Sequence, residues 1–388
     1  DGSTGHEFWA HDTSNHSTWQ VADIGVGSGS IPGMNIQILI GDTIYFDADE
    51  GSTGRELWAH DTSNHSTWQV ADIGIGGWNS NVGATMSTLV GDTLYFDADE
   101  ATGPELWAHD TSNHSTWQVT NIRIGNGGSA PGQYMELLVG DTLYFSAFDA
   151  QSGQELWAHD TSNASTWRVA DINSGTGNSN PGRLMEILAG DTLYFSADDG
   201  SSGRELWAHD TSNASTWQVA DINSGASSSN PGQYMSTLVG DTLYFSAYDP
   251  SSGHEIWAHD TSNASTWQVA DVNSGTGGSN PGVYTEILVG DTLYITATDG
   301  NSGYELWAHD TSNASTWQVA DIWGGTSSSY PGNHMAIYVG DTLYFNAYIG
   351  ASGSGNELWA HRPSSIDYNT NTGGTVTSWT INASLPSG

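Results

Sequence analysis

The chain has 388 residues, with 44 acidic residues against six arginines and no lysine, so its formal net charge is −38. This balance argues against nucleic acid and anionic membrane surfaces as partners, because both are bound by clustered lysines and arginines. The sequence has no cysteine, which removes disulfides, thiolate metal sites and cysteine nucleophiles, while cations, neutral sugars and basic proteins remain as partners.

Membrane insertion is not expected, because no stretch approaches the ~20 consecutive apolar residues of a membrane-spanning helix. The hydrophobic fraction of 36%, with 18 tryptophans and 16 tyrosines, is sufficient for a packed core. The sequence shows no signal peptide and begins at Asp1 in the middle of a repeated motif. We interpret it as a processed or truncated product.

The chain is built of internal repeats. Residues 6–24 form a predicted hairpin, and a Gly-Asp-Thr triplet then recurs at intervals of 49 or 50 residues, beginning at Gly41, Gly91, Gly140, Gly190, Gly240, Gly290 and Gly340. Self-similarity at such a period is typical of solenoids and propellers.

Each repeat contains four short apolar runs separated by Gly, Asn, Asp, Ser and Pro. A first run ends in Leu-Val-Gly or a similar triplet, and three runs follow, for example over Asp191–Ala197, Glu205–His209 and Thr216–Ile222. Their apolar and polar residues alternate with a period of two, which predicts strands. Four strands in about 50 residues indicate a blade of a β-propeller.

The longest connection, for example over Asn223–Gly232, is rich in Gly, Ser and Pro, and we assign it to the crossing between blades. Antiparallel strands then place the crossing loops on one rim, together with the loops between the second and third strands. The Gly-Asp turns and the Asp-Thr-Ser-Asn turns fall on the opposite rim.

The sequence therefore predicts an all-β fold, a single β-propeller domain over residues 1–388 with four-stranded blades. Seven blades with a spare or closing N-terminal hairpin at 1–24 are our first choice, and eight blades, one incomplete or shared, are the alternative. The last repeat is altered, with its fourth strand predicted over Thr377–Ile381 and a tail at 382–388. The spare hairpin could pair with another chain, because free strand edges favour association and hence a homo-oligomer.

The block Glu205-Leu206-Trp207-Ala208-His209-Asp210 and the Leu-Tyr-Phe-Ser-Ala-Asp-Asp-Gly run before it resemble the ELWxxDGT-repeat family of secreted bacterial proteins. The resemblance covers residues 6–362, but Thr211 and Ser212 stand where the family has Gly-Thr. It implies an extracellular location and propeller-like repeats, and it implies no settled activity.

Most recurring residues are interpreted as structural. A histidine follows the third-strand tryptophan by two residues at His11, His60, His109, His159, His209, His259, His309 and His361. Metal binding would need several of these imidazoles within ~2 Å of one ion, which separated blades do not provide. We expect each histidine to hydrogen-bond a buried Asp, Ser or Thr. The paired strand tryptophans, such as Trp207 and Trp217, are expected to pack between blades.

Residues that depart from the repeat are the candidates for ligand binding. Trp78 and Trp323 lie in crossing loops where other repeats have Asn, Ser or Gly, and Tyr330 lies in the same crossing loop as Trp323. An aromatic ring beside polar residues suits stacking on the apolar face of a sugar. We therefore predict a carbohydrate site formed by these three residues.

Two further kinds of site follow from the loops. Calcium, which prefers six to eight oxygen ligands, is a candidate at the acidic loops after the second strand, with Asp49, Glu50, Asp99, Glu100, Asp198 and Asp199 as ligands. No cofactor is otherwise required. Asn-x-Ser, a glycosylation acceptor in a host with the machinery, occurs at Asn15, Asn64, Asn113, Asn163, Asn213, Asn263, Asn313 and Asn382.

No Ser, His and Asp arrangement stands outside the repeat, so we expect no enzyme. The sequence predicts a secreted binding or adhesion protein, lectin-like and multivalent toward glycans, with calcium as a possible aid. A self-assembling extracellular structural protein is the first alternative. A glycoside hydrolase is the second, because carboxylates are plentiful.

Overall fold

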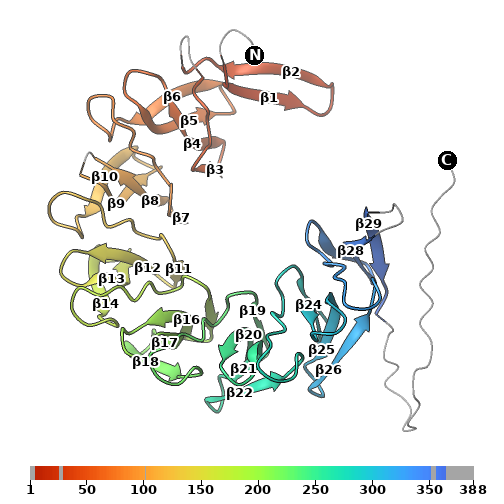
Figure 1. The fold of residues 1–388 in the computed structure, drawn as a ribbon. Coiled ribbons are helices and arrows are strands. Elements are labelled where there is room, and N and C mark those ends of the chain that lie inside the picture. The colour runs from red at the N-terminus through yellow and green to blue at the C-terminus, as the bar shows by residue number, and fades with distance from the viewer. Residues whose placement is uncertain (1–4, 26–28, 101, 351–354, 364–388) are drawn as a thin grey trace. The chain divides into compact units, whose positions relative to one another are not determined.

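The computed structural model describes residues 5–25, 29–100, 102–350 and 355–363. All regular structure in these ranges is β-strand (Figure 1). No helix long and apolar enough to cross a membrane occurs in the described part of the chain. The chain divides into two compact units, unit 1 (Asp1–Ser228) and unit 2 (Ser229–Gly388), which are described separately.

In the part of unit 1 that the structure describes, there are a two-stranded sheet and four four-stranded sheets, which we call blades. The two-stranded sheet consists of β1 (Phe8–Asp12) and β2 (Ser17–Ala22). The blades consist of β3 (Gln37–Ile40), β4 (Thr43–Asp49), β5 (Arg55–Asp61) and β6 (Ser66–Ala71); β7 (Ser87–Val90), β8 (Thr93–Asp99), β9 (Pro104–Asp110) and β10 (Ser115–Thr120); β11 (Glu136–Val139), β12 (Thr142–Asp149), β13 (Gly153–Asp160) and β14 (Ser165–Ala170); and β15 (Glu186–Ala189), β16 (Thr192–Asp198), β17 (Arg204–Asp210) and β18 (Ser215–Ala220).

The described residues of unit 2 form two four-stranded blades and a three-stranded sheet. Their strands are β19 (Ser236–Val239), β20 (Thr242–Asp249), β21 (Gly253–Asp260) and β22 (Ser265–Ala270); β23 (Glu286–Val289), β24 (Thr292–Thr298), β25 (Tyr304–Asp310) and β26 (Ser315–Ala320); and β27 (Ala336–Val339), β28 (Thr342–Ile349) and β29 (Gly355–His361).

Within every blade the strands pair in chain order and antiparallel, as in a propeller blade. This confirms the predicted all-β propeller of four-stranded blades, and the predicted strand boundaries of the repeat at residues 191–222 differ by at most two residues. The fourth strand predicted over Thr377–Ile381 lies outside the described residues. The choice between seven and eight blades stays a prediction.

The core lies between neighbouring blades. In unit 1, Met135, Tyr144 and Leu156 of one blade pack against Phe195 and Ala197 of the next. In unit 2 the same face, with Met235 and Tyr244, packs against Leu293 and Ile295. Phe195, Leu156 and their equivalents in the four-stranded blades are buried, whereas Leu358 of β29 is 66% exposed. Removal of apolar area from water therefore holds adjacent four-stranded blades together.

The two rims have the loops that the sequence predicts. At one rim, Thr211 N donates to Asp191 O over 2.8 Å, which joins an Asp-Thr-Ser-Asn turn to a Gly-Asp turn. At the other rim, Ser179 N donates to Gln154 O over 3.0 Å, which joins a crossing loop to the start of β13. We call this second edge of each blade the crossing-loop rim.

The Asp-Thr-Ser-Asn turns contain a strained position. Ala214 has a φ of 59°, and the equivalent residues of the other turns, alanine or histidine, have φ between 57° and 62°. A side chain in this left-handed region costs roughly 1–2 kcal/mol, which glycine avoids at a backbone-entropy cost of roughly 0.5–1 kcal/mol.

We therefore expect Ala214→Gly to raise the free energy of unfolding by about 0.5 kcal/mol, measured by urea unfolding. Ala220→Gly is the matched control, because Ala220 ends β18 without a positive φ. It should lower stability by about 0.5–1 kcal/mol. Equal effects of the two substitutions would contradict the assignment of strain to Ala214.

Candidate ligand-binding site

The recurring histidines link strands and blades. The Nδ1 atom of His209 lies 2.8 Å from Thr216 Oγ1 on the neighbouring outer strand, and its ring centroid lies 5.4 Å from that of Tyr144 in the preceding blade. Burial lowers the pKa of His209. The same bond to threonine occurs at His11, His60, His109, His159, His259 and His309. In the described ranges, no three His, Asp or Glu side chains are grouped to hold a metal.

A buried glutamate on the third strand of each four-stranded blade holds the crossing loop, whereas Glu357 of β29 is exposed. Glu155 is fully buried and accepts hydrogen bonds from Ile172 N (2.8 Å), Ser179 N (3.1 Å) and Ser179 Oγ (2.8 Å). Burial raises the pKa of Glu155 to about 7, although these donors oppose the shift. Glu305 has the same role in unit 2, where Ser329 N and Oγ donate to it over 2.9 and 2.6 Å.

The Asn-x-Ser asparagines have a structural use. Asn213 Nδ2 donates to Asp210 Oδ2 over 2.6 Å, and Asn213 Oδ1 accepts from Ser215 N over 2.9 Å. Asn15, Asn64, Asn113, Asn163, Asn263 and Asn313 make the same pair of bonds. This geometry accounts for the asparagine by itself, and glycosylation stays a prediction. Asn382 lies outside the described residues.

The acidic loops proposed for calcium use their carboxylates within the loop. Asp49 Oδ1 accepts from Gly51 N, Asp99 Oδ1 from Gly103 N, and Asp198 Oδ1 from Gly200 N. Asp199 Oδ1 accepts from Ser201 N and Ser202 N, and Glu50 bonds the hydroxyl of Ser52, while Glu100 is exposed. Calcium binding at these loops stays a prediction.

Glutamates on the first strands join neighbouring blades. In unit 1, Glu136 accepts from Ser87 N over 3.2 Å and bonds the Thr88 hydroxyl. The main-chain N–H of Glu136 donates in turn to Glu186. The Oε2 atom of Glu186 is buried and has no partner among the described residues. Burial, with the charge of Glu136, raises the pKa of Glu186 to about 7.

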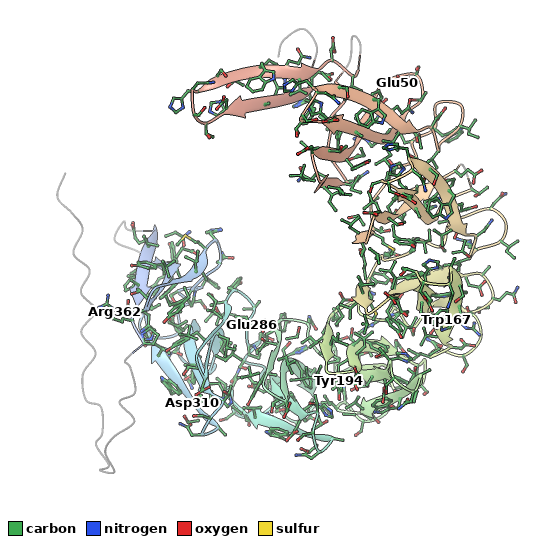
Figure 2. All side chains as sticks on the ribbon, turned by 180° about the vertical axis from the view of Figure 1, so that it is seen from behind. Glu50, Trp167, Tyr194, Glu286, Asp310 and Arg362 are labelled. Atoms are coloured by element: carbon green, nitrogen blue, oxygen red, sulfur yellow. The ribbon has the colours of Figure 1, made fainter. Side chains whose placement is uncertain are left out.

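In unit 2, Glu286, which is labelled in Figure 2, makes the corresponding bond and accepts from Ser236 N over 3.2 Å. Its other oxygen, Oε1, is likewise buried without a partner. Burial raises the pKa of Glu286. These inner-strand carboxylates therefore act as ties between blades.

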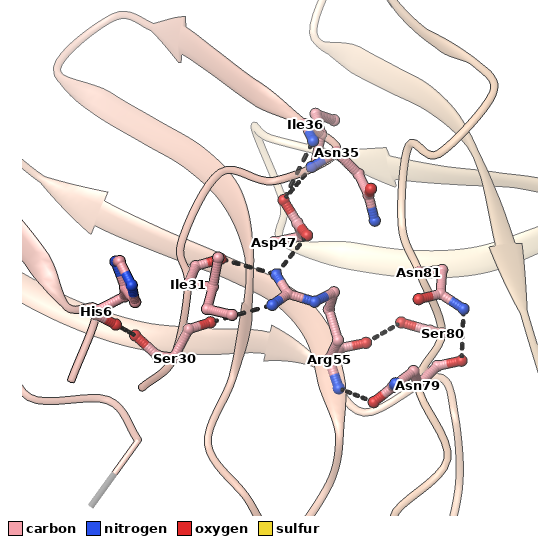
Figure 3. A network of polar contacts seen from close by, with 10 residues as sticks. All are labelled: His6, Ser30, Ile31, Asn35, Ile36, Asp47, Arg55, Asn79, Ser80 and Asn81. Atoms are coloured by element: carbon pink, nitrogen blue, oxygen red, sulfur yellow. Dashed lines mark hydrogen bonds and ion pairs between the residues drawn. The ribbon is translucent and has the colours of Figure 1, made fainter. Parts of the chain in front are cut away.

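The residue before each third-strand glutamate occupies a slot beneath a crossing loop. Arg55 fills this slot with a buried guanidinium, whose Nη1 donates to Asp47 Oδ2 (2.7 Å) and Ile31 O (2.8 Å) (Figure 3). Arg204 fills the equivalent slot and donates to Asn180 O over 2.9 Å. A slot arginine therefore supports the crossing loop in two of the four blades of unit 1. In unit 2 the slot holds His254, Tyr304 and Asn356.

Three tyrosines meet at the crossing-loop rim of unit 2. Tyr330 N donates to Tyr304 O over 3.2 Å, and the two rings are nearly parallel, with centroids 6.1 Å apart. Tyr284, just before β23, is perpendicular to both, at 6.0 Å from Tyr304 and 5.5 Å from Tyr330. Tyr330 is 38% exposed, so the rings present an aromatic surface to solvent.

The aromatic surface continues onto the neighbouring blade. Asn280 Nδ2 donates to the Tyr304 hydroxyl over 2.5 Å, and Asn280 N donates to His254 O over 3.1 Å. The ring of His254 lies 5.1 Å from Tyr234 and 5.2 Å from Tyr248. We call the six residues Tyr234, Tyr248, His254, Tyr284, Tyr304 and Tyr330 the aromatic strip.

The three aromatic residues predicted to bind sugar have different settings. Tyr330 belongs to the aromatic strip. Trp323 instead packs on the following sheet, 5.1 Å from Tyr348 of β28 and against Gly350, where an added Cβ would lie 2.1 Å from the indole. Trp78 lies in a crossing loop of unit 1 and is 66% exposed. No ring contact therefore joins any two of Trp78, Trp323 and Tyr330 in the structure.

Sequence reasoning missed Tyr234, Tyr284 and Tyr304, although a signal was present. In the four blades of unit 1, in chain order, the slot holds Arg, Pro, Gln and Arg. The position two residues before the first strand holds Asn, Thr, Tyr and Leu in the same blades. Of the described blades, the one formed by β23–β26 alone has tyrosine at both positions and at the loop residue that follows. Aligning departures from the repeat by position would have found it.

Comparison of the sequence with protein families and with curated proteins finds no match. Among solved structures, the chain is similar to the extracellular domain of a putative one-component system from B. thetaiotaomicron (13% identity, TM-score 0.38, 85% of this chain and 38% of that one). It is also similar to a puromycin-hydrolyzing peptidase of Mycobacterium tuberculosis (10%, 0.41, 93% and 54%) and to BamB from Moraxella catarrhalis (15%, 0.36, 79% and 77%). Likenesses at this level carry no information about ligand or activity.

The buried carboxyl group of Glu186 predicts that the stability of the fold depends on pH. The folded-state pKa of Glu186 is raised to about 7, so its contribution to stability is present at low pH and is lost as the pH rises through that value. The free energy of unfolding of Glu186→Gln, taken relative to that of the wild type, should therefore increase by about 1–3 kcal/mol as the pH rises from about 5 to about 8.5.

Urea unfolding at both pH values measures this difference. Glu136→Gln is the control: burial also raises the pKa of Glu136, but hydrogen bonds from Thr88 and Ser87 oppose the shift, so its gain should be smaller. A pH-independent effect of Glu186→Gln would contradict the interpretation.

Proposed function

We propose that the protein is a secreted, non-enzymatic carbohydrate-binding module and that the aromatic strip contacts the sugar. The observation that supports this is the convergence of Tyr284, Tyr304 and Tyr330. The apolar C–H face of a sugar ring can lie on a tyrosine ring and remove both surfaces from water. Tyrosine supplies this contact area at a low cost in side-chain entropy.

The strip suits an oligosaccharide better than a single sugar. It extends over two neighbouring blades, from Tyr248 and His254 to Tyr284 and Tyr330, linked by the bond from Asn280 to Tyr304. Successive sugar units on one chain would bind at a raised effective concentration once the first is seated. Weak contacts at each ring then add to a useful affinity.

The alternatives have less support. A glycoside hydrolase needs two carboxylates flanking a bond in a pocket, whereas Glu136 and Glu186 are engaged with main-chain groups of the adjacent inner strand. Self-assembly through strand edges would use the free edge of β1, which is paired only with β2 among the described strands. Its tryptophan Trp9 is 43% exposed. No described contact identifies a partner for this edge.

Tyr330→Asn tests the proposal. Asparagine occupies the equivalent position at Asn180, Asn230 and Asn280 with φ of 45–50°, as Tyr330 does, so the variant should fold without added strain. Loss of the exposed ring should weaken binding of neutral oligosaccharides about tenfold, measured by calorimetric titration after a glycan array has identified the best ligand.

Trp78→Ala is the matched control and should bind as the wild type does, because Trp78 lies outside the strip. Retained binding by Tyr330→Asn, or loss only with Trp78→Ala, would show that the strip is not the site. Repeating the titration with a calcium chelator tests the predicted aid from calcium. The affinity for the oligosaccharide should then fall.

A further inference from the structure

Two aromatic rings on the crossing-loop rim of unit 1 are covered by the chain's own arginines. The guanidinium of Arg183 lies 5.7 Å from the ring centroid of Tyr134 in the preceding blade. The guanidinium of Arg123 lies 4.6 Å from the ring centroid of Phe148. Both distances are within the range of a cation–π attraction. On this rim, therefore, aromatic faces are paired with cationic side chains of the same chain.

The equivalent rings of unit 2 have no such cover. Tyr284 occupies the repeat position of Tyr134, and Asn333 occupies the position of Arg183 in the following repeat. The single arginine of unit 2, Arg362, forms an ion pair with Asp341 over 3.4 Å, at the rim of the Gly-Asp turns. Tyr284 therefore keeps the ring position of unit 1 without its arginine.

A carboxylate is held in the loop that leads to Tyr304 of the strip. Asp299 begins the loop that ends at Tyr304, and its Oδ1 accepts from Asn301 N (2.8 Å), Ser302 N (2.7 Å) and Ser302 Oγ (2.8 Å). Although burial opposes it, these donors hold the pKa of Asp299 below its usual value. Asp299 is thus a negative charge at neutral pH, within a chain of net charge −38.

We propose that the aromatic strip binds amino-sugar oligomers, with a ligand ammonium group over the face of Tyr284 in the place that Arg183 takes over Tyr134. This inference rests on the proposed function and specifies its substrate class. The sugar ring supplies the C–H face that stacks on tyrosine, and the ammonium supplies the charge that the acidic surface attracts. Anionic glycans are disfavoured by the same charge.

The probes are a glucosamine hexamer and an N-acetylglucosamine hexamer. The first has an amine on each sugar that can be protonated, and the second has a neutral amide in its place. At mildly acidic pH and low salt, the glucosamine hexamer should bind the wild type about tenfold more tightly. The difference should shrink as salt is added, because screening weakens exposed charge interactions. Calorimetric titration measures both affinities.

Asn333→Arg is the decisive variant, because it places a guanidinium where Arg183 stands in unit 1. The new side chain should cover Tyr284 and lower the affinity for the glucosamine hexamer about tenfold, while affinity for the acetylated hexamer changes less. Gln133→Arg is the matched control. It adds the same charge at the same repeat position, but the preceding blade has Thr85 where a ring would stand. Both Asn333 and Gln133 are exposed, so neither substitution disturbs the core.

The outcomes separate the two proposals. Equal affinity of the wild type for both hexamers would overturn the inference and leave the proposed function in place. Equal losses in Asn333→Arg and Gln133→Arg, or no loss in Asn333→Arg, would overturn the placement over Tyr284. Binding of neither hexamer nor of any neutral oligosaccharide would overturn both.

Discussion

The buried carboxylate on the third strand of each four-stranded blade is the interaction on which the crossing-loop rim depends. Each crossing loop is long and rich in Gly and Ser, and such a segment has few apolar side chains of its own to order it. Glu305 orders one of these loops by accepting from Ile322 N, Ser329 N and Ser329 Oγ. Tyr330 directly follows Ser329, so the same bonds place its ring beside Tyr304.

The repeat separates scaffold from site. His209 with Thr216, Asp210 with Asn213, and their equivalents recur in successive blades with nearly the same distances. A bond that every blade needs cannot distinguish one ligand from another. Specificity therefore has to come from positions at which blades differ, and these lie at the slot, before the first strand, and in the crossing loop.

The few arginines of the chain are used internally. Arg55 neutralises buried Asp47, Arg204 caps a crossing-loop carbonyl, and Arg123 and Arg183 lie on aromatic rings. The acidic residues have few cationic partners left, so the surface keeps a strong negative field. Aromatic faces in such a field are suited to neutral or cationic ligands, which is the physical reason for the two proposals.

The sequence by itself determined the strands, their order and the two rims, because period-two patterning and a 50-residue repeat are local properties that need no knowledge of distant contacts. It also singled out Tyr330 as an exception in its loop. Only the tertiary structure decided that Tyr284, Tyr304 and Tyr330 meet while Trp323 turns onto Tyr348. The two partners of each ring contact are separated by 20 or more positions in the chain. Blade packing and loop hydrogen bonds, which no local pattern encodes, bring them together.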